Sequence, residues 1–233
     1  SNTKNGFNVS SSDLSLSELE YRNDKTFRVE LHNSQSYEIE ISSFAINGSY
    51  FISGSTIPAN SYTVYDSGDF TATLESEIDT GSGTVQFINR FGSVLDEFSY
   101  GYSGRAPDFV RGYTIAKTSG TGNDADVWTI DLTPTMGSAN DAPAPNLNPV
   151  VVINEVNPHA GSSFIELYNN SSSSIDISGY SIVVDDVLTI SGGTTIDSYS
   201  YYVIDEADYP ADFALTSWDG LNNQNIYLYD SAD

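Results

Sequence analysis

Apolar and polar residues alternate along much of this chain with a period of two, which is the pattern of a β-strand with one buried face. In residues 27–31 every second residue is apolar, and the residues between them are charged. Gly, Asn, Ser and Pro gather between such stretches, and Asn47-Gly48 is a strong signal of a tight hairpin turn. The pattern therefore predicts an all-β chain with almost no helix.

The stretch 151–184 contains three predicted strands, at 151–156, 164–168 and 175–184, with turn residues between them. An earlier strand begins near residue 14, and its alternation breaks at Ser17-Glu18, which predicts a β-bulge. A polar lead-in is expected at 1–11. Further strands are expected at 27–31, 39–46, 50–52, 61–65, 85–89, 94–100, 110–116 and 127–132.

Residues 151–184 repeat the pattern of residues 16–46, so the chain carries one module written twice. Glu155 corresponds to Glu18, Glu166 to Glu30, and the correspondence continues to residue 230. Matching apolar residues keep their side of the pleat, which predicts two β-sandwiches with equivalent cores. In particular, the core residues Val29 and Leu31 are expected to be equivalent to Ile165 and Leu167. The proline-rich stretch 141–149 is predicted to be an extended linker.

The segments VVINEVNP, FIELYNNS, IDISGYSI, GTTI and YYVID resemble the lamin tail domain. The first copy adds an ending similar to that of the family, in the segments 96–101, 126–129 and 133–140 together with Arg105. This resemblance covers nearly all of the chain from about Asp13. It implies an immunoglobulin-like sandwich of a kind found in intermediate-filament tails and in bacterial and archaeal surface and secreted proteins. No heptad pattern occurs, so the coiled coil of true lamins is not expected.

The resemblance implies two immunoglobulin-like β-sandwich domains in tandem. The first is expected at 1–146, including the lead-in and the linker, and the second at 147–233. The second copy ends just after the strand that corresponds to 85–89, so it is expected to be incomplete and to expose a strand edge. Self-association through this open edge is one expected consequence.

The charge is strongly negative and unevenly distributed. The chain has 8 Lys and Arg against 32 Asp and Glu, a net charge of −24, and every Lys and Arg lies at or before Lys117. Such a surface repels phosphate backbones, which argues against nucleic-acid binding. It favours a soluble extracellular or salt-adapted protein. Divalent cations are the alternative, with the acidic turns 123–126 and 185–186 as candidate ligands, although neither matches a known calcium loop.

Localisation is expected to be extracellular or at the cell surface. No apolar run reaches the roughly 18–20 residues of a membrane span, so no membrane insertion is expected. The start Ser1-Asn2-Thr3-Lys4 lacks the apolar core of a signal peptide, and a start without Met is typical of a chain whose leader has been removed. The chain has no Cys, so thiols give no information on its compartment.

No catalytic constellation is visible. His32 and His159 lie beside ordinary strand and turn signals, and no nucleophile elbow, phosphate-binding loop or zinc motif occurs. The carboxylate pairs Glu18/Glu30 and Glu155/Glu166 are the sharpest candidates, because paired carboxylates can hydrolyse glycosides. Since both pairs occur at equivalent positions of a shared fold, they are interpreted as structural groups that hydrogen-bond backbone. No catalytic, cofactor-binding or metal-binding residue is predicted.

Other polar and aromatic residues have structural interpretations. Asn33 and Asn169 are expected to close Asx turns. Trp128, Trp218 and the 16 tyrosines are expected mainly in cores and cross-strand pairs, although an exposed coplanar row would favour sugar binding. The predicted function is a non-catalytic structural, adhesive or interaction module that needs no cofactor and binds a protein or a cell-surface polymer. The alternative is a carbohydrate-binding accessory module of a larger extracellular enzyme.

Overall fold

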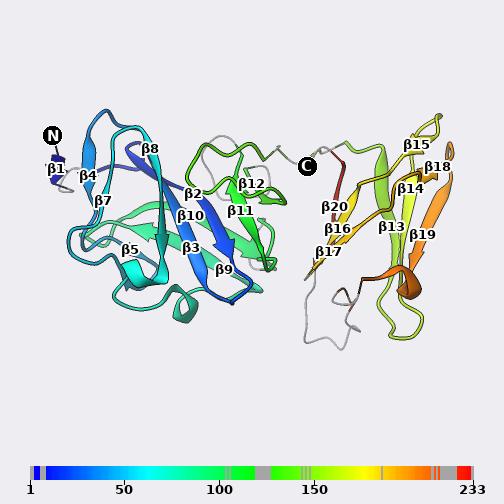
Figure 1. Ribbon diagram of the computed structural model, residues 1–233, viewed down its shortest axis with the longest axis horizontal. Helices are drawn as coiled ribbons and strands as arrows, with labels where there is room; N and C mark the ends of the chain where they lie inside the picture. Colours follow the sequence, from blue (N-terminus) through cyan, green and yellow to red (C-terminus); the bar gives the residue numbers. More distant parts are fainter. Residues whose placement is uncertain are drawn as a thin grey trace. The chain divides into compact units, whose positions relative to one another are not determined.

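The computed structural model describes residues 3–5, 9–102, 104, 106–118, 127–142, 144, 146, 148–184, 186–210, 213, 215 and 225–231. Over these residues the chain is all-β, with three single-turn 3-10 helices at Ser67–Asp69, Leu74–Ser76 and Glu206–Asp208. It divides into two compact units, Ser1–Pro145 and Asn146–Asp233, called here the first and the second unit. Figure 1 labels their strands. No helix in the described part of the chain is long and apolar enough to cross a membrane.

Two sheets pack face to face in the first unit (Figure 1). The larger sheet contains, in spatial order, β12 (Trp128–Asp131), β11 (Tyr113–Lys117), β2 (Leu14–Tyr21), β3 (Phe27–Asn33) and β8 (Ser61–Asp66). The smaller sheet contains β10 (Val94–Gly101), β9 (Ser82–Ile88), β5 (Ala45–Ile46) and β6 (Ser49–Tyr50). A third group contains β1 (Thr3–Asn5), β4 (Glu38–Glu40) and β7 (Thr56–Ile57).

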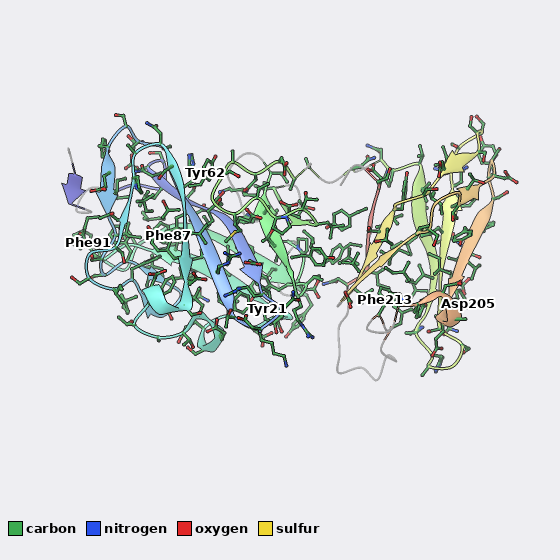
Figure 2. All side chains as sticks on the ribbon, in the orientation of Figure 1. Tyr21, Tyr62, Phe87, Phe91, Asp205 and Phe213 are labelled. Carbon is green, nitrogen blue, oxygen red and sulfur yellow. The ribbon has the colours of Figure 1, made fainter. Side chains whose placement is uncertain are left out.

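The core of the first unit lies between the two larger sheets. Val29 and Leu31 from β3 and Phe87 from β9 are fully buried in one apolar cluster, because the pleat turns every second side chain inward. Burying a side chain of this size stabilises the fold by roughly 1.5–3 kcal/mol. Phe91, at the tip of the hairpin between β9 and β10, is instead exposed (Figure 2).

The second unit repeats this layout with fewer strands. One sheet contains β13 (Val151–Asn157), β14 (Phe164–Asn169) and β19 (Tyr201–Asp205), and another contains β17 (Val187–Thr189), β16 (Ser181–Val183) and β20 (Tyr227–Tyr229). The short strands β15 (Ile175–Asp176) and β18 (Thr195–Ile196) pair with each other. Ile165 and Leu167 are fully buried, as the alignment with β3 predicts.

Strand pairing is repeated between the units residue by residue. Glu18 on β2 lies opposite Glu30 on β3, and Glu155 on β13 lies opposite Glu166 on β14. Both ladders shift register just before the first glutamate of the pair, which confirms the bulge predicted at Ser17-Glu18. Two further pairings have counterparts with the same register. The pairing of β4 with β7 in the first unit corresponds to that of β15 with β18 in the second, and the pairing of β5 with β9 corresponds to that of β16 with β20.

The prediction of continuous strands at 39–46 and 175–184 is wrong. Each stretch forms two short strands that belong to different sheets, and a turn separates them. In the second unit the turn contains Gly179 with φ 78°, and in the first unit Ser43 has φ 69° at the same place. A residue with positive φ reverses the local direction of the chain, so the strand leaves one sheet and enters the other.

A buried asparagine fixes the same corner in both units. Asn33 and Asn169 are both fully buried at the ends of β3 and β14. The Asn33 side-chain amide donates to the carbonyls of Tyr37, Ile57 and Pro58, and its oxygen accepts from the amide of Gln35. Asn169 makes the same four bonds, with Ser173, Ile196, Asp197 and Ser171. The predicted Asx turns are confirmed, and each side chain also holds the loop before the next long strand.

Three predicted boundaries differ from the structure. Residues 3–5 of the expected lead-in form β1, which pairs in parallel with β4. The strand expected at 110–116 begins only at Tyr113, because a turn occupies the residues before it. In the stretch expected at 50–52, Phe51 forms an isolated bridge with Phe70 instead of continuing β6. The described residues of 141–150 have no helix or strand, in agreement with the predicted linker.

Candidate interaction surfaces

The first carboxylate pair is enclosed in the first unit. Glu18 and Glu30 have no exposed surface. Glu18 accepts hydrogen bonds from the hydroxyls of Thr114 and Thr135 and from the backbone amide of Thr135. Glu30 accepts from the backbone amide of Gly137. The strand β11 and the loop 133–140 therefore close over this pair, and the structural interpretation is confirmed for the first unit.

Burial also changes the protonation of this pair. It raises the pKa of Glu30 to about 7, against the opposing effects of hydrogen bonds from Gly137 and Ser17. Burial raises the pKa of Glu18 as well, although its three hydrogen bonds act in the other direction. Shifted carboxylates often mark active sites, but a substrate has no access to these two. They do not form a glycosidase site.

The second carboxylate pair is open to solvent, so the prediction of one shared structural role is wrong for the second unit. Glu155 is exposed and Glu166 is partly exposed. The only hydrogen bond to this pair from a described residue comes from the side-chain amide of Asn154, which donates to Glu166 at 2.6 Å. The physical reason is that no described residue of the second unit occupies the place of β11 and the loop 133–140.

The strand β13 is an open edge in the described part of the second unit. It is the outermost strand of its sheet, and β14 is its one neighbour there. The carbonyl of Val150 accepts from the amide of Asn170, on the side of β14. Because the groups of an antiparallel strand alternate in direction, the amides and carbonyls of Val151 and Ile153 point to the open side. In the first unit, β11 covers residues 18–21 of β2, which correspond to residues 155–158 of the second unit.

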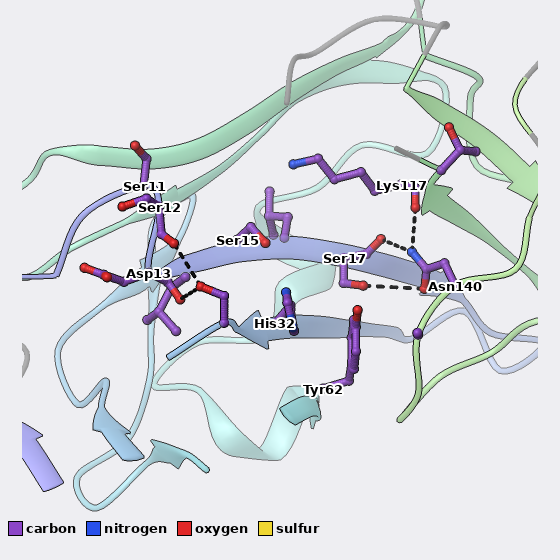
Figure 3. Close-up of a pocket in the computed structure, with 14 residues that line it drawn as sticks. Ser11, Ser12, Asp13, Ser15, Ser17, His32, Tyr62, Lys117 and Asn140 are labelled. Atoms are coloured by element: carbon purple, nitrogen blue, oxygen red, sulfur yellow. Dashed lines mark hydrogen bonds between the residues drawn. The ribbon is translucent and has the colours of Figure 1, made fainter. Parts of the chain in front are cut away.

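A hollow of about 310 Å³ lies on the outer face of the first unit (Figure 3). His32 and Tyr62 form its floor, with stacked rings whose centroids are 4.3 Å apart. Several serines line the rim, and Asn140 donates to the carbonyls of Ser17 and Lys117. Burial lowers the pKa of His32, so its imidazole is neutral at neutral pH. No described serine hydroxyl is hydrogen-bonded to this ring, so the hollow holds no Ser-His pair.

The aromatic pair is also repeated in the second unit. Tyr168 and Tyr201 occupy the positions of His32 and Tyr62, with ring centroids 4.8 Å apart and planes tilted by 32°. Tyr201 is 57% exposed and its neighbour Val203 is 48% exposed. Tyr199, just before β19, is 58% exposed. The outer face of β14 and β19 therefore presents aromatic and apolar groups to solvent.

The other candidate residues are dispersed. His159 lies in an exposed turn, where its amide donates to Asn157. Within the described ranges no three His, Cys, Asp or Glu side chains gather to hold a metal. The acidic turn 123–126, considered above as a candidate for cation binding, lies outside the described residues, as do Asp185, Arg105 and Trp218. Trp128 is fully buried and stacks on Phe98, as expected for a core tryptophan.

The sandwich of the second unit, with its repeated pairings, resembles a known domain. Residues 144–233 match the family model of the Lamin Tail Domain. This match spans the whole second unit. Lamin tail domains are immunoglobulin-like, are generally non-catalytic, and often act as protein-interaction modules. No curated protein and no solved structure matches the chain.

Sequence reasoning missed two features of the second unit. The exposure of Glu155 and Glu166 depends on distant segments, and nothing in their own neighbourhood indicates it. The exposed aromatic face had a readable signal. Tyr201 and Val203 alternate with the inward-facing Tyr202 and Ile204, so a strand apolar on both faces could have been recognised.

Proposed function

We propose that this chain is a non-catalytic structural or interaction module built from two lamin-tail-like domains. In this proposal both units are copies of the same domain, and the chain acts at the cell surface or in a secreted protein. It binds a protein or a surface polymer. Repetition of the strand pairings and of the buried asparagine supports the tandem arrangement.

The observation that carries the proposal is the exposed aromatic face of β14 and β19. Tyr201 and Val203 are about half exposed, although folded chains normally bury aromatic and β-branched residues. Tyrosine is enriched in protein interfaces because it combines a large apolar area with a polar tip. The exposed aromatic and apolar side chains support a binding role for this surface, and the described residues hold no activated nucleophile.

Carbohydrate binding is the second candidate. The neighbouring rings of Tyr168 and Tyr201 favour it, because sugars pack on exposed aromatic rings. The 32° tilt between the planes is less favourable, since a coplanar row would be the better platform. Affinity electrophoresis in gels that contain soluble polysaccharides measures this candidate directly. If the polysaccharide retards the chain and Tyr201→Ser abolishes this retardation, the partner is a glycan and not a protein.

The test uses photocrosslinking from two matched positions of the full chain. A benzophenone amino acid replaces Tyr201 in one protein and Tyr50, which is 52% exposed in the first unit, in the control. Partners crosslinked only from position 201 are purified and titrated against the unmodified chain. Binding should weaken about tenfold in Tyr201→Ser and stay unchanged in Tyr50→Ser.

Two results would count against this function. A set of partners that binds equally well to both variants would remove the aromatic face from the proposal. Turnover of an ester, glycoside or phosphodiester by the purified chain would contradict its non-catalytic character.

A further inference from the structure

We propose that the open edge of β13 binds an extended segment of a partner polypeptide as an added strand. The segment has the chemistry of residues 113–117 and 133–140 of the first unit: a strand with a threonine, followed later by a Thr-x-Gly turn. The inference deepens the proposed function, on which it rests, by naming a partner class. It concerns a different surface from the aromatic face.

The first unit shows how this edge is completed. There β11 runs antiparallel to β2, with Ile115 opposite Leu19 and Ala116 opposite Glu18. The hydroxyl of Thr114 donates to the Glu18 carboxylate. The loop 133–140 then crosses the outer face, where Thr135 and Gly137 donate their backbone amides to Glu18 and Glu30. Strand and loop together supply hydrogen-bond donors to both carboxylates.

The second unit carries the receiving half of this arrangement. Glu155 and Glu166 face each other as Glu18 and Glu30 do, after a bulge at the same place. Their carboxylates are open to solvent, and Val156, which corresponds to Leu19, lies on the stretch of β13 that a counterpart of β11 would cover. Equal registers predict that the bound strand places an isoleucine-like residue opposite Val156 and a small residue opposite Glu155.

The side chains of this edge also select the partner by charge. The second unit contains 13 Asp and Glu and no Lys or Arg, so it repels acidic segments. The carboxylates of Glu155 and Glu166 are acceptors only, and therefore need hydroxyl or amide donors. A strand of low net charge that supplies a threonine hydroxyl and the two amides of a Thr-x-Gly turn meets both conditions. Addition of a strand to an exposed edge is a recurring mode of peptide recognition.

The probe is a fluorescent peptide with the sequence of residues 110–140, titrated with the full chain and followed by anisotropy. Saturable binding is expected, and the double variant E155Q/E166Q should weaken it about tenfold because it removes charge-assisted acceptors. Asp197→Asn is the matched control: it removes an exposed carboxylate of the same unit, in the turn between β18 and β19, and should leave binding unchanged. Thr114→Val with Thr135→Val in the peptide should also weaken binding.

Hydrogen exchange locates the bound peptide. Protection should rise over residues 155–157 in the complex, and circular dichroism should show the same strand content in E155Q/E166Q as in the parent chain. Self-association of the chain that the peptide competes away would support strand addition and identify a second copy as the donor.

Three results would overturn the proposal: no binding up to about 1 mM peptide, equal binding by E155Q/E166Q and the parent chain, or protection confined to residues 14–21. The last would mean exchange of β11 in the first unit. Loss of peptide binding with intact Tyr201-dependent partner binding would refute the strand addition alone. Intact peptide binding together with loss of the Tyr201-dependent partner binding would refute the proposed use of the aromatic face.

Discussion

Replacing Glu30 by glutamine is expected to remove a pH-dependent loss of stability from the first unit. The carboxyl of Glu30 has an ordinary pKa of 4.5 in the unfolded chain and a pKa of about 7 in the folded unit, because burial disfavours its charge. Between these values the folded state binds more protons than the unfolded state. The free energy of unfolding therefore falls as the pH rises from about 4.5 to about 7.

The size of the effect follows from the same pKa values. Each pKa unit corresponds to about 1.4 kcal/mol, so the shift of Glu30 from 4.5 to about 7 accounts for a loss of at most about 3.5 kcal/mol across this window. Raised pKa values of Glu18 and Asp131 act in the same direction. The pKa values of Asp24, Glu40 and Glu75 are lowered, so these groups destabilise the first unit at acid pH, where they become protonated. Glutamine keeps the shape of the side chain and can still accept from Gly137.

Urea unfolding measures this effect when it is followed by the fluorescence of Trp128, which is buried against Phe98. A Trp218→Phe background leaves Trp128 as the single reporter, and about 0.5 M salt screens the net charge of −24. Glu30→Gln should match the parent near pH 4.5 and exceed its stability by about 1–3 kcal/mol at pH 8. The exposed Glu77→Gln is the control and should follow the parent at every pH. If the difference between Glu30→Gln and the parent is constant with pH, the buried carboxyl is not the cause.

Three further predictions concern the corners and turns. Asn33→Ala should destabilise the first unit by about 3–5 kcal/mol in denaturant unfolding, because it removes three hydrogen bonds to loop carbonyls, and Asn169→Ala should do the same in the second unit. A loss below about 1 kcal/mol would contradict this. Ser43→Gly should stabilise the first unit by roughly 0.5–1 kcal/mol, because glycine adopts the φ of 69° found there without strain. Gly179→Ser should destabilise the second unit by a similar amount. Changes of the opposite sign would refute the strain argument. Calcium should raise the melting temperature only slightly, although a specific site would add about 2.7 kcal/mol when calcium is at about 100 times Kd. A large rise that mutation of Asp124 and Asp126 abolishes would show a real site.

Strand positions and core parity could be predicted because alternation is a local signal. The switch between sheets at Ser43 was harder to predict, although the spacing of apolar residues in the sequence indicates it. Ile41 and Phe44 are both buried but are spaced by three residues, which a continuous strand cannot place on one face. In the second copy Gly179 marks the same switch directly. A serine with positive φ carries no comparable signal.

The candidate surfaces were less predictable, because exposure is a property of the assembled unit. Glu30 and Glu166 have nearly identical neighbours in sequence and in strand pairing. Glu30 is covered by a loop more than one hundred residues away in the chain, whereas no described loop covers Glu166 in this way. The tandem of two lamin tail domains stays a proposal that rests on the repeated pairings.

The confinement of every Lys and Arg to the part of the chain up to Lys117 has a practical consequence. Trypsin cleaves after these residues, so it has no cleavage point within 118–233, whether this segment is folded or unfolded. Amine-directed dyes and crosslinkers likewise attach to no side chain of the second unit. Since the chain has no Cys, a single engineered thiol on β19 or β13 would give each surface its own label.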